Sequence, residues 1–171
     1  MIPRLRPQGG FTFVEILITL VFLSIAMLAM TSQFPLGLKV SQSAEDFTLA
    51  TNLAQELMEE IRSMAWEDPQ TSGAPLGPDS GEWDRLEFDD IDDYDDLVEA
   101  PPNDLDGNPL NGQGGRANLA RYQRDVTVTY ADPTTLAASA SVTGLKRIVV
   151  EVANVDTGQR STLVLIKAWR P

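Results

Sequence analysis

Glu15 is an acidic residue at the start of an apolar stretch, where a carboxylate needs a special environment. From Ile16 to Leu38 the sequence holds no charged side chain. An acid inside such a segment costs about 2.5 to 3.5 kcal/mol on membrane-insertion scales, so it marks a functional site whose partner must be found. The sequence places no cation close to it. Either Glu15 pairs with a cation of another molecule, or it lies one helical turn into the segment and reaches the lipid headgroups.

A second group of acids lies between residues 79 and 106, where 13 carboxylates accompany a single base, Arg85. Such clusters suit hard cations that prefer oxygen ligands. Asp104 and Asp106 belong to a short sequence, Asp-Leu-Asp-Gly-Asn, that is similar to the start of a calcium loop. The other ligand positions and the closing glutamate of an EF-hand are missing. We therefore expect no resident cofactor and a solvated acidic surface, with calcium at Asp104 and Asp106 as the alternative.

Composition excludes several other kinds of chemistry. The 171 residues include no cysteine and no histidine, which removes the disulfide, the usual catalytic base and the soft metal ligands. Residues 1–40 carry a net charge of +2, so residues 41–171 carry −14 of the total of −12 and should repel nucleic acid. A hydrolase using paired carboxylates needs a cleft, and this cluster has the composition of an exposed loop. We expect neither a nucleic-acid-binding protein nor an enzyme.

The element that must position Glu15 is a helix long enough to cross a membrane. Residues 16–38 would span roughly 35 Å as a helix, against about 30 Å of hydrocarbon. Arg4 and Arg6 precede the segment, so residues 1–10 should stay in the cytoplasm while the acidic part crosses. The apolar run is longer than that of a secretory signal peptide and lacks a clear small-x-small cleavage pattern. An uncleaved signal anchor is the remaining alternative.

The residues around Glu15 resemble the cleavage signal of type IV prepilins. The matching sequence is Gly-Gly-Phe-Thr-Phe-Val-Glu at residues 9–15, with Phe13 where many members of that family have leucine or isoleucine. The resemblance covers residues 9 to about 30. It implies that prepilin peptidase cuts between Gly10 and Phe11 and methylates the new N-terminus. It also implies that Glu15 pairs with the N-terminal ammonium of a neighbouring subunit, an ion pair that fixes register more than it adds stability.

Downstream, apolar residues continue at helical spacing to about residue 65, which predicts one helix over residues 12–65. Pro35 and Gly37 should kink this helix without ending it. Residues 67–121 are rich in proline and glycine and predict a long ordered loop. Within it an apolar residue recurs every three positions, which predicts a turn-like or 3₁₀ path with Phe88, Ile91, Tyr94 and Leu97 inward and the carboxylates outward. This run also resembles a segment of MSHA-type minor pilins.

The last third alternates in the manner of β-strands. Strands are expected near residues 126–131, 145–155 and 160–169, with a tight turn at Asp156–Gln159 between the last two. The predicted fold class is α+β, with a long pilin-type helix packed on a small antiparallel sheet of three or four strands. The expected divisions are a cleaved basic leader (1–10), a transmembrane and assembly helix (11–38), the amphipathic half of that helix (39–66), an acidic Pro/Gly-rich loop region (67–121) and the sheet (122–171).

Taken with the resemblance, these features predict a minor pilin or pseudopilin of a type IV pilus or a type II secretion system. Its implied partners are other pilin-like subunits, prepilin peptidase and the inner membrane. It would cross the bacterial inner membrane once, with its C-terminal domain in the periplasm before assembly. The alternative is a membrane-tethered periplasmic binding module, with or without calcium dependence, that does not polymerise.

Overall fold

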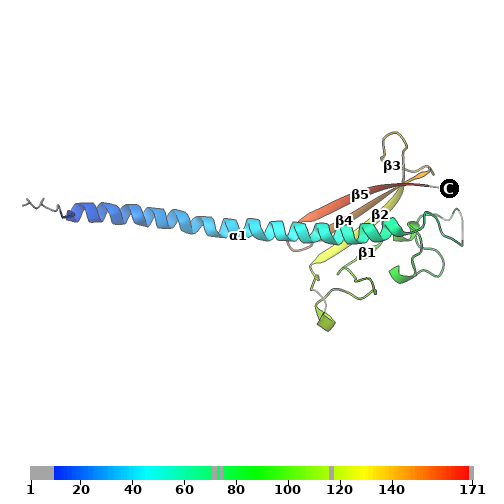
Figure 1. Ribbon diagram of the computed structural model, residues 1–171, viewed down its shortest axis with the longest axis horizontal. Coiled ribbons are helices and arrows are strands. Elements are labelled where there is room, and N and C mark those ends of the chain that lie inside the picture. Colours follow the sequence, from blue (N-terminus) through cyan, green and yellow to red (C-terminus); the bar gives the residue numbers. More distant parts are fainter. Residues whose placement is uncertain (1–9, 71–72, 74, 116–117, 170–171) are drawn as a thin grey trace, which may run out of the picture. The chain divides into compact units, whose positions relative to one another are not determined.

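The computed structural model describes residues 10–70, 73, 75–115 and 118–169. It is an α+β structure with one long helix, α1 (Phe13–Ser63), and an antiparallel sheet (Figure 1). The chain divides into two compact units, Met1–Gln42 and Ser43–Pro171, and α1 belongs to both. Arg4 and Arg6 of the predicted leader lie outside the described residues.

Helix α1 matches the predicted helix to within two residues at each end. It runs through Pro35 and Gly37 without ending, as expected, although the predicted kink stays a prediction. Its first part, Phe13–Thr31, has a mean hydropathy of 2.5 and is long and apolar enough to cross a membrane. The side chains of this part that the structure describes are exposed within the single chain, so the protein itself gives them no apolar partner.

The sheet contains five strands in the order β1-β2-β4-β5, with β3 paired to the end of β2. The long strands are β2 (Tyr122–Ala131), β4 (Leu145–Asn154) and β5 (Arg160–Ala168), which confirms the three predicted strands. The predicted turn is also present, because the Asn154 amide donates to the Gln159 carbonyl and Gly158 has a φ of 72°. Two strands of two residues each, β1 (Val98–Glu99) and β3 (Ala138–Ser139), bring the number above the three or four expected.

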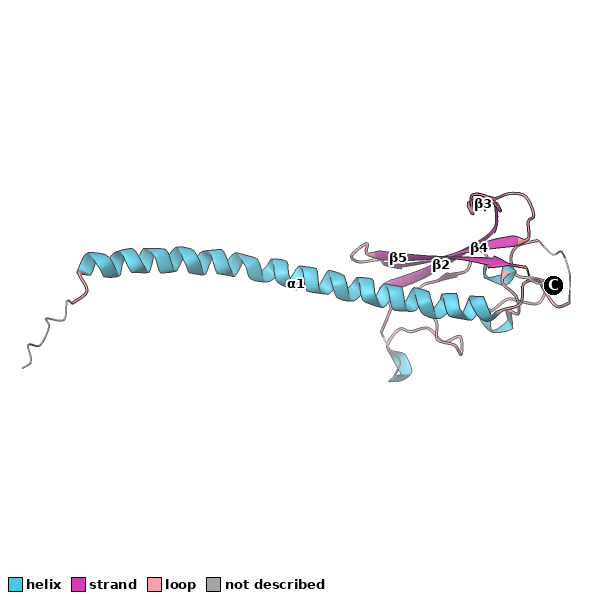
Figure 2. Ribbon diagram, turned by 45° about the horizontal axis from the view of Figure 1, so that its top comes forward, coloured by secondary structure: helices cyan, strands magenta, loops and turns pink. Residues whose placement is uncertain are grey.

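The core of the second unit lies between the C-terminal part of α1 and one face of the sheet (Figure 2). Leu53, Leu57 and Ile61 recur at helical spacing and are buried. Opposite them, alternate residues of the two central strands are buried, which in β4 gives a strict alternation along its whole length. Near the start of this unit the Tyr122 hydroxyl donates a hydrogen bond of 2.9 Å to the buried carboxylate of Asp46. This bond connects β2 to α1.

The segment between α1 and β2 is more structured than a loop. It contains the 3₁₀ turns η1 (Arg85–Glu87), η2 (Asp92–Tyr94) and η3 (Gln113–Gly115) in addition to β1. The predicted inward set is confirmed: Ile91 and Tyr94 are fully buried, and Phe88 and Leu97 pack against the core. The prediction that the carboxylates of this run point outward is wrong for three of them, because Asp90, Asp92 and Asp93 are buried.

Candidate functional site

The predicted processing and assembly residues lie at the beginning of α1. Gly10, Phe11 and Thr12 precede the helix, and the Phe11 side chain is 81% exposed. The Thr12 hydroxyl accepts a hydrogen bond from the Glu15 amide at 3.3 Å, which makes Thr12 the N-cap and Glu15 the third helical residue. Threonine at the cap with glutamate three residues later is a known helix-start pattern, so the sequence itself contains a signal for the beginning of α1. Gly10 and Phe11 are therefore accessible next to a capped helix.

The position of Glu15 near the start of α1 lets its carboxylate interact with the helix dipole, but the free energy of this interaction is small. An acid in the first helical turn interacts favourably with the helix dipole, typically by about 0.3 to 1 kcal/mol. The insertion cost of a carboxylate in hydrocarbon is several times larger. In the described residues no cation forms an ion pair with Glu15, in agreement with the sequence. The dipole therefore does not offset the cost, and the described residues supply no counter-ion for Glu15.

Within Phe13–Thr31, the other polar side chains are satisfied internally. The hydroxyl groups of Thr19, Ser24 and Thr31 donate to the carbonyls four residues earlier, at 2.7 to 2.8 Å. Such bonds remove the need for water, which a hydrocarbon environment does not supply. The first part of α1 is thus compatible with lipid or with the interior of a protein assembly everywhere except at Glu15.

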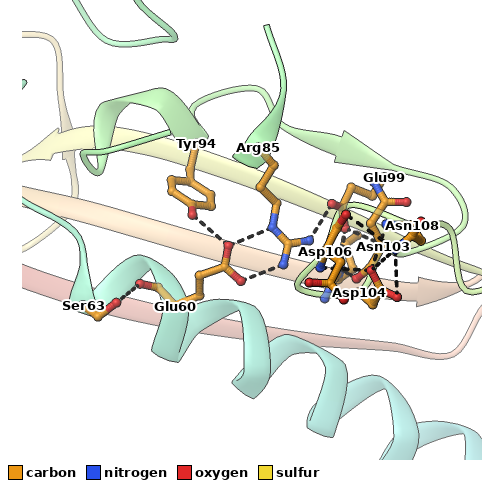
Figure 3. Close-up of polar contacts among 10 residues, drawn as sticks. Glu60, Ser63, Arg85, Tyr94, Glu99, Asn103, Asp104, Asp106 and Asn108 are labelled. Atoms are coloured by element: carbon orange, nitrogen blue, oxygen red, sulfur yellow. Dashed lines mark hydrogen bonds and ion pairs between the residues drawn. The ribbon is translucent and has the colours of Figure 1, made fainter. Parts of the chain in front are cut away.

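In the second unit, four charged residues form a chain of ion pairs. Figure 3 labels three of them, Glu60, Arg85 and Glu99. Arg85 makes a bidentate contact with Glu60 of α1, at 2.8 and 2.7 Å, and its third nitrogen donates to Glu99 of β1 at 2.7 Å. Glu99 also accepts from Arg124 of β2, and the Tyr94 hydroxyl donates to Glu60 at 2.8 Å. The network connects the helix, the acidic segment and the sheet through side chains that are almost completely buried.

The pKa values in this network follow from its geometry. Burial alone would raise the pKa of Glu60, but the hydrogen bonds from Arg85 and Tyr94 outweigh it and lower the pKa below the ordinary value. Burial raises the pKa of Tyr94, and the neighbouring carboxylate of Glu60 raises it further. Glu60 is therefore held as the anion that receives these bonds.

A second buried group surrounds Lys146. Its Nζ lies 2.7 Å from Asp92, bonds the Trp66 carbonyl and sits 4.6 Å from the centre of the Trp66 ring. Asp90, next to this pair, accepts from the amides of Asp92 and Asp93, yet burial raises its pKa to about 6, with the charge of Asp93 contributing in the same direction. Lys146 thus balances part of a carboxylate cluster that the protein has placed inside.

Asp104 and Asp106, the calcium ligands of the alternative prediction, lie at a turn, and the group of converging carboxylates that the described residues form does not include them. Asp104 Oδ1 accepts hydrogen bonds from the amides of Asp106 and Asn108, at 3.0 and 2.8 Å. The carboxylate therefore stabilises its own turn, and Gly107 supplies the positive φ of 76° that the turn requires. The structure does not test calcium binding at these residues, so that alternative stays a prediction.

Three other acidic residues, here called the trio, have carboxylate oxygens that converge on one place. One oxygen from each of Glu82, Asp89 and Asp93 lies within 4.8 Å of the others. Asp93 is buried, and its Oδ2 accepts from the amides of Asp89 and Asp90, both at 3.0 Å. Burial and the nearby charge of Asp93 raise the pKa of Glu82 to about 7, with the Asp79 amide acting in the opposite direction. Sequence spacing gave no indication of this trio, because the three residues converge only after η2 folds back.

Sequence reasoning also missed Arg85, Arg124 and Lys146 as structural residues. A signal for two of them was present: Arg124 has the same strand parity as the buried Val126 and Val128, and Lys146 the same parity as Ile148 and Val150. A cation in line with core residues needs a buried acid, and the acidic segment supplies it. Arg85 carried no comparable periodic signal.

Comparison of the chain with known protein families, curated proteins and solved structures finds no match.

The buried network predicts a large effect of Arg85→Met. The change leaves Glu60 and Glu99 partly unpaired inside the protein, which costs about 3 to 5 kcal/mol of unfolding free energy. Arg160→Met is the matched control, since Arg160 pairs with Glu151 at 2.9 Å on the surface and should cost less than about 1 kcal/mol. Urea unfolding of the full chain in detergent measures both. Equal losses would contradict a stabilising role for the buried pairs.

The raised pKa of Asp90 predicts a pH effect of defined sign. The folded protein holds a proton on Asp90 up to about pH 6, whereas the unfolded chain releases it near 3.8, so this group makes stability fall as pH rises between the two values. Asp90→Asn, whose side-chain oxygen can still accept from the Asp92 amide, should be more stable than the parent above pH 6 and lose that advantage toward pH 4. Thermal melts at pH 4, 5, 6 and 7.5 give the comparison. An advantage that grows on acidification would refute it.

Proposed function

We propose that this chain is a subunit of a pilin-like filament, a minor pilin or pseudopilin of a type IV pilus or type II secretion system. The observation that carries the proposal is the beginning of α1: an accessible Gly10-Phe11 bond, a threonine-capped helix, and Glu15 next to an exposed apolar surface that the chain does not cover. Before assembly the apolar part of α1 lies in the inner membrane. After assembly the same surface packs against the helices of other subunits.

In this proposal Glu15 receives its missing partner from processing. Prepilin peptidase cuts after Gly10 and methylates the amino group of Phe11, which keeps its positive charge. The ammonium of one subunit then meets Glu15 of a neighbour inside an apolar helix bundle. A buried pair of this kind adds little net stability, because both charges lose water, but a subunit placed in the wrong register leaves both charges unpaired. The pair therefore selects the correct axial position.

The competing function is a tethered binding module that uses its acidic segment and never polymerises. The trio of Glu82, Asp89 and Asp93 favours it, since three converging carboxylates are compatible with a hard cation. It leaves Glu15 without a partner, however. We prefer the filament subunit for that reason.

Cleavage provides the first test. Protein isolated from membranes of a cell with prepilin peptidase should begin at Phe11, and the mass of its N-terminal peptide should include one methyl group. The same protein from a peptidase-deficient strain, the control, should begin at Met1. An N-terminus at Met1 in both strains would remove the assignment.

Glu15→Val separates assembly from anchoring. If Glu15 only supports its own helix, its loss costs about 0.3 to 1 kcal/mol, and incorporation changes less than about fivefold. If it pairs with an ammonium in an apolar interior, the unpaired cation costs about 3 to 5 kcal/mol, and incorporation falls more than about a hundredfold while membrane insertion and cleavage continue. Quantitative blotting of sheared filaments and membranes measures this, with Glu45→Val on the exposed face of α1 as the control. Wild-type incorporation of the Glu15 variant would disprove the pairing.

A further inference from the structure

Two grooves flank the C-terminal end of α1, and they differ in charge. The first, here called the acidic groove, has a volume of about 220 Å³ and lies between α1, η1 and the turn at Asp104–Gly107. The second, the basic groove, has a volume of about 560 Å³ and lies between the end of α1 and β5. Met64 contributes to both, so they lie on the two flanks of the same helix end.

The acidic groove combines exposed apolar side chains with acidic residues. Leu86 and Leu105 line it and are 59% and 67% exposed. Asp104 lines it as well, and Asp106, the chain neighbour of Leu105, is exposed. The cation that lines the groove, Arg85, has its nitrogens bonded to Glu60 and Glu99, so it does not neutralise these acids. This surface fits an apolar surface that carries basic residues.

The basic groove offers that combination. Leu165 and Ile166 line it together with Arg62 and Lys167. Lys167 Nζ donates to the carbonyls of Arg62 and Met64, at 3.1 and 2.6 Å, and among the described residues no carboxylate forms an ion pair with it. Arg62 contacts Glu59 on the same exposed helix face, a type of pair that contributes little and can exchange partners.

The two grooves also face different sides of the domain. Arg85, in the acidic groove, bonds Glu99 of β1, which is one edge of the sheet, whereas the basic groove includes β5, the other edge. Surfaces that are complementary but lie on different sides of a molecule form a head-to-tail contact, which can repeat from copy to copy. The net charge of −14 on residues 41–171 opposes such association at long range, but at physiological salt screening acts beyond about 8 Å, and the local charges then decide.

We propose that the acidic groove of one copy of this chain docks on the basic groove of a second copy. The contact places Leu105 of one copy against β5 of the next and brings Asp106 near Arg62. It rests on the proposed function, because subunits aligned by their helices bring their globular domains side by side. It adds that this chain occupies successive positions in the assembly.

The absence of cysteine from the natural chain makes disulfide crosslinking a clean test. Full-length Leu105→Cys and Ala168→Cys chains, carrying different epitope tags, are co-expressed in cells and oxidised with copper phenanthroline and oxygen. A disulfide forms only where the two Cα atoms approach to about 7 Å or less. The mixed dimer should form, and Leu105→Cys paired with Val155→Cys, an exposed control outside both grooves, should give at least about tenfold less.

Charge exchange tests the electrostatic part of the same contact. In the Leu105→Cys and Ala168→Cys pair, Asp106→Lys or Arg62→Glu in both chains should lower the mixed dimer about twofold to fivefold, the effect of an exposed charge pair. The two changes together should restore it, because each contact again has one charge of each sign. Failure of the double change to restore the dimer would overturn the proposed pairing.

Filament incorporation, measured in the same cells, separates this inference from the proposed function. Normal incorporation without a mixed dimer would disprove self-docking and leave the filament role intact. A disulfide between Leu105→Cys and a different subunit, without one to a second copy of this chain, would likewise disprove self-docking and leave the filament role intact. Loss of both incorporation and the mixed dimer would count against both proposals.

Discussion

The guanidinium group of Arg85 is the point where the three parts of the globular domain meet. It binds Glu60 on α1 and Glu99 on β1 while its own backbone belongs to the acidic segment. A buried carboxylate is tolerated only when it is paired and hydrogen-bonded, and Glu60 and Glu99 satisfy that condition through Arg85, Arg124 and Tyr94. The segment that carries most of the acids therefore folds against the helix because cations are available in the core to receive it.

This constraint explains the distribution of charge in the whole domain. Arg85, Arg124 and Lys146 are all buried, so they act against internal carboxylates and leave the surface strongly negative. Replacing such a network with apolar residues can be neutral for stability, whereas removing one member is costly. The network therefore specifies one arrangement of segment, helix and sheet more than it increases stability. A fixed arrangement is what the proposed filament subunit would need, because its surfaces would have to meet a neighbour reproducibly.

Sequence patterns predicted the elements that have a strict period and failed where burial depends on distant partners. Leu53, Leu57 and Ile61 repeat at helical spacing, and the central strands alternate, so α1, β2, β4 and β5 could be located from local residues. The three-residue spacing also predicted the burial of Ile91 and Tyr94. The burial of Asp92 could not be predicted in this way, because Lys146 lies more than fifty residues away. Strands of two residues, such as β1, are too short to show any period.

The residues of the candidate site also fall into two groups: those that the local sequence could indicate, and those that only tertiary folding brings together. Gly10, Phe11 and Glu15 are close together in the sequence, so their resemblance to a prepilin cleavage signal could be recognised without the structure, and the structure adds the Thr12 cap. The trio of Glu82, Asp89 and Asp93 and the two grooves beside α1 depend on tertiary folding and could be found only in three dimensions.

The central claim is that the acidic segment is an integral part of the folded domain and not a solvated loop. Native-state hydrogen exchange of the full chain in detergent tests it most directly, since amides in a cooperative core exchange only on global unfolding. The amides of Ile91 and Tyr94, which bond the carbonyls of Ala65 and Ile91, should be as protected as those of Val150 in β4. Exchange of the Ile91 and Tyr94 amides at the rate of an unstructured peptide, with β4 still protected, would contradict the account.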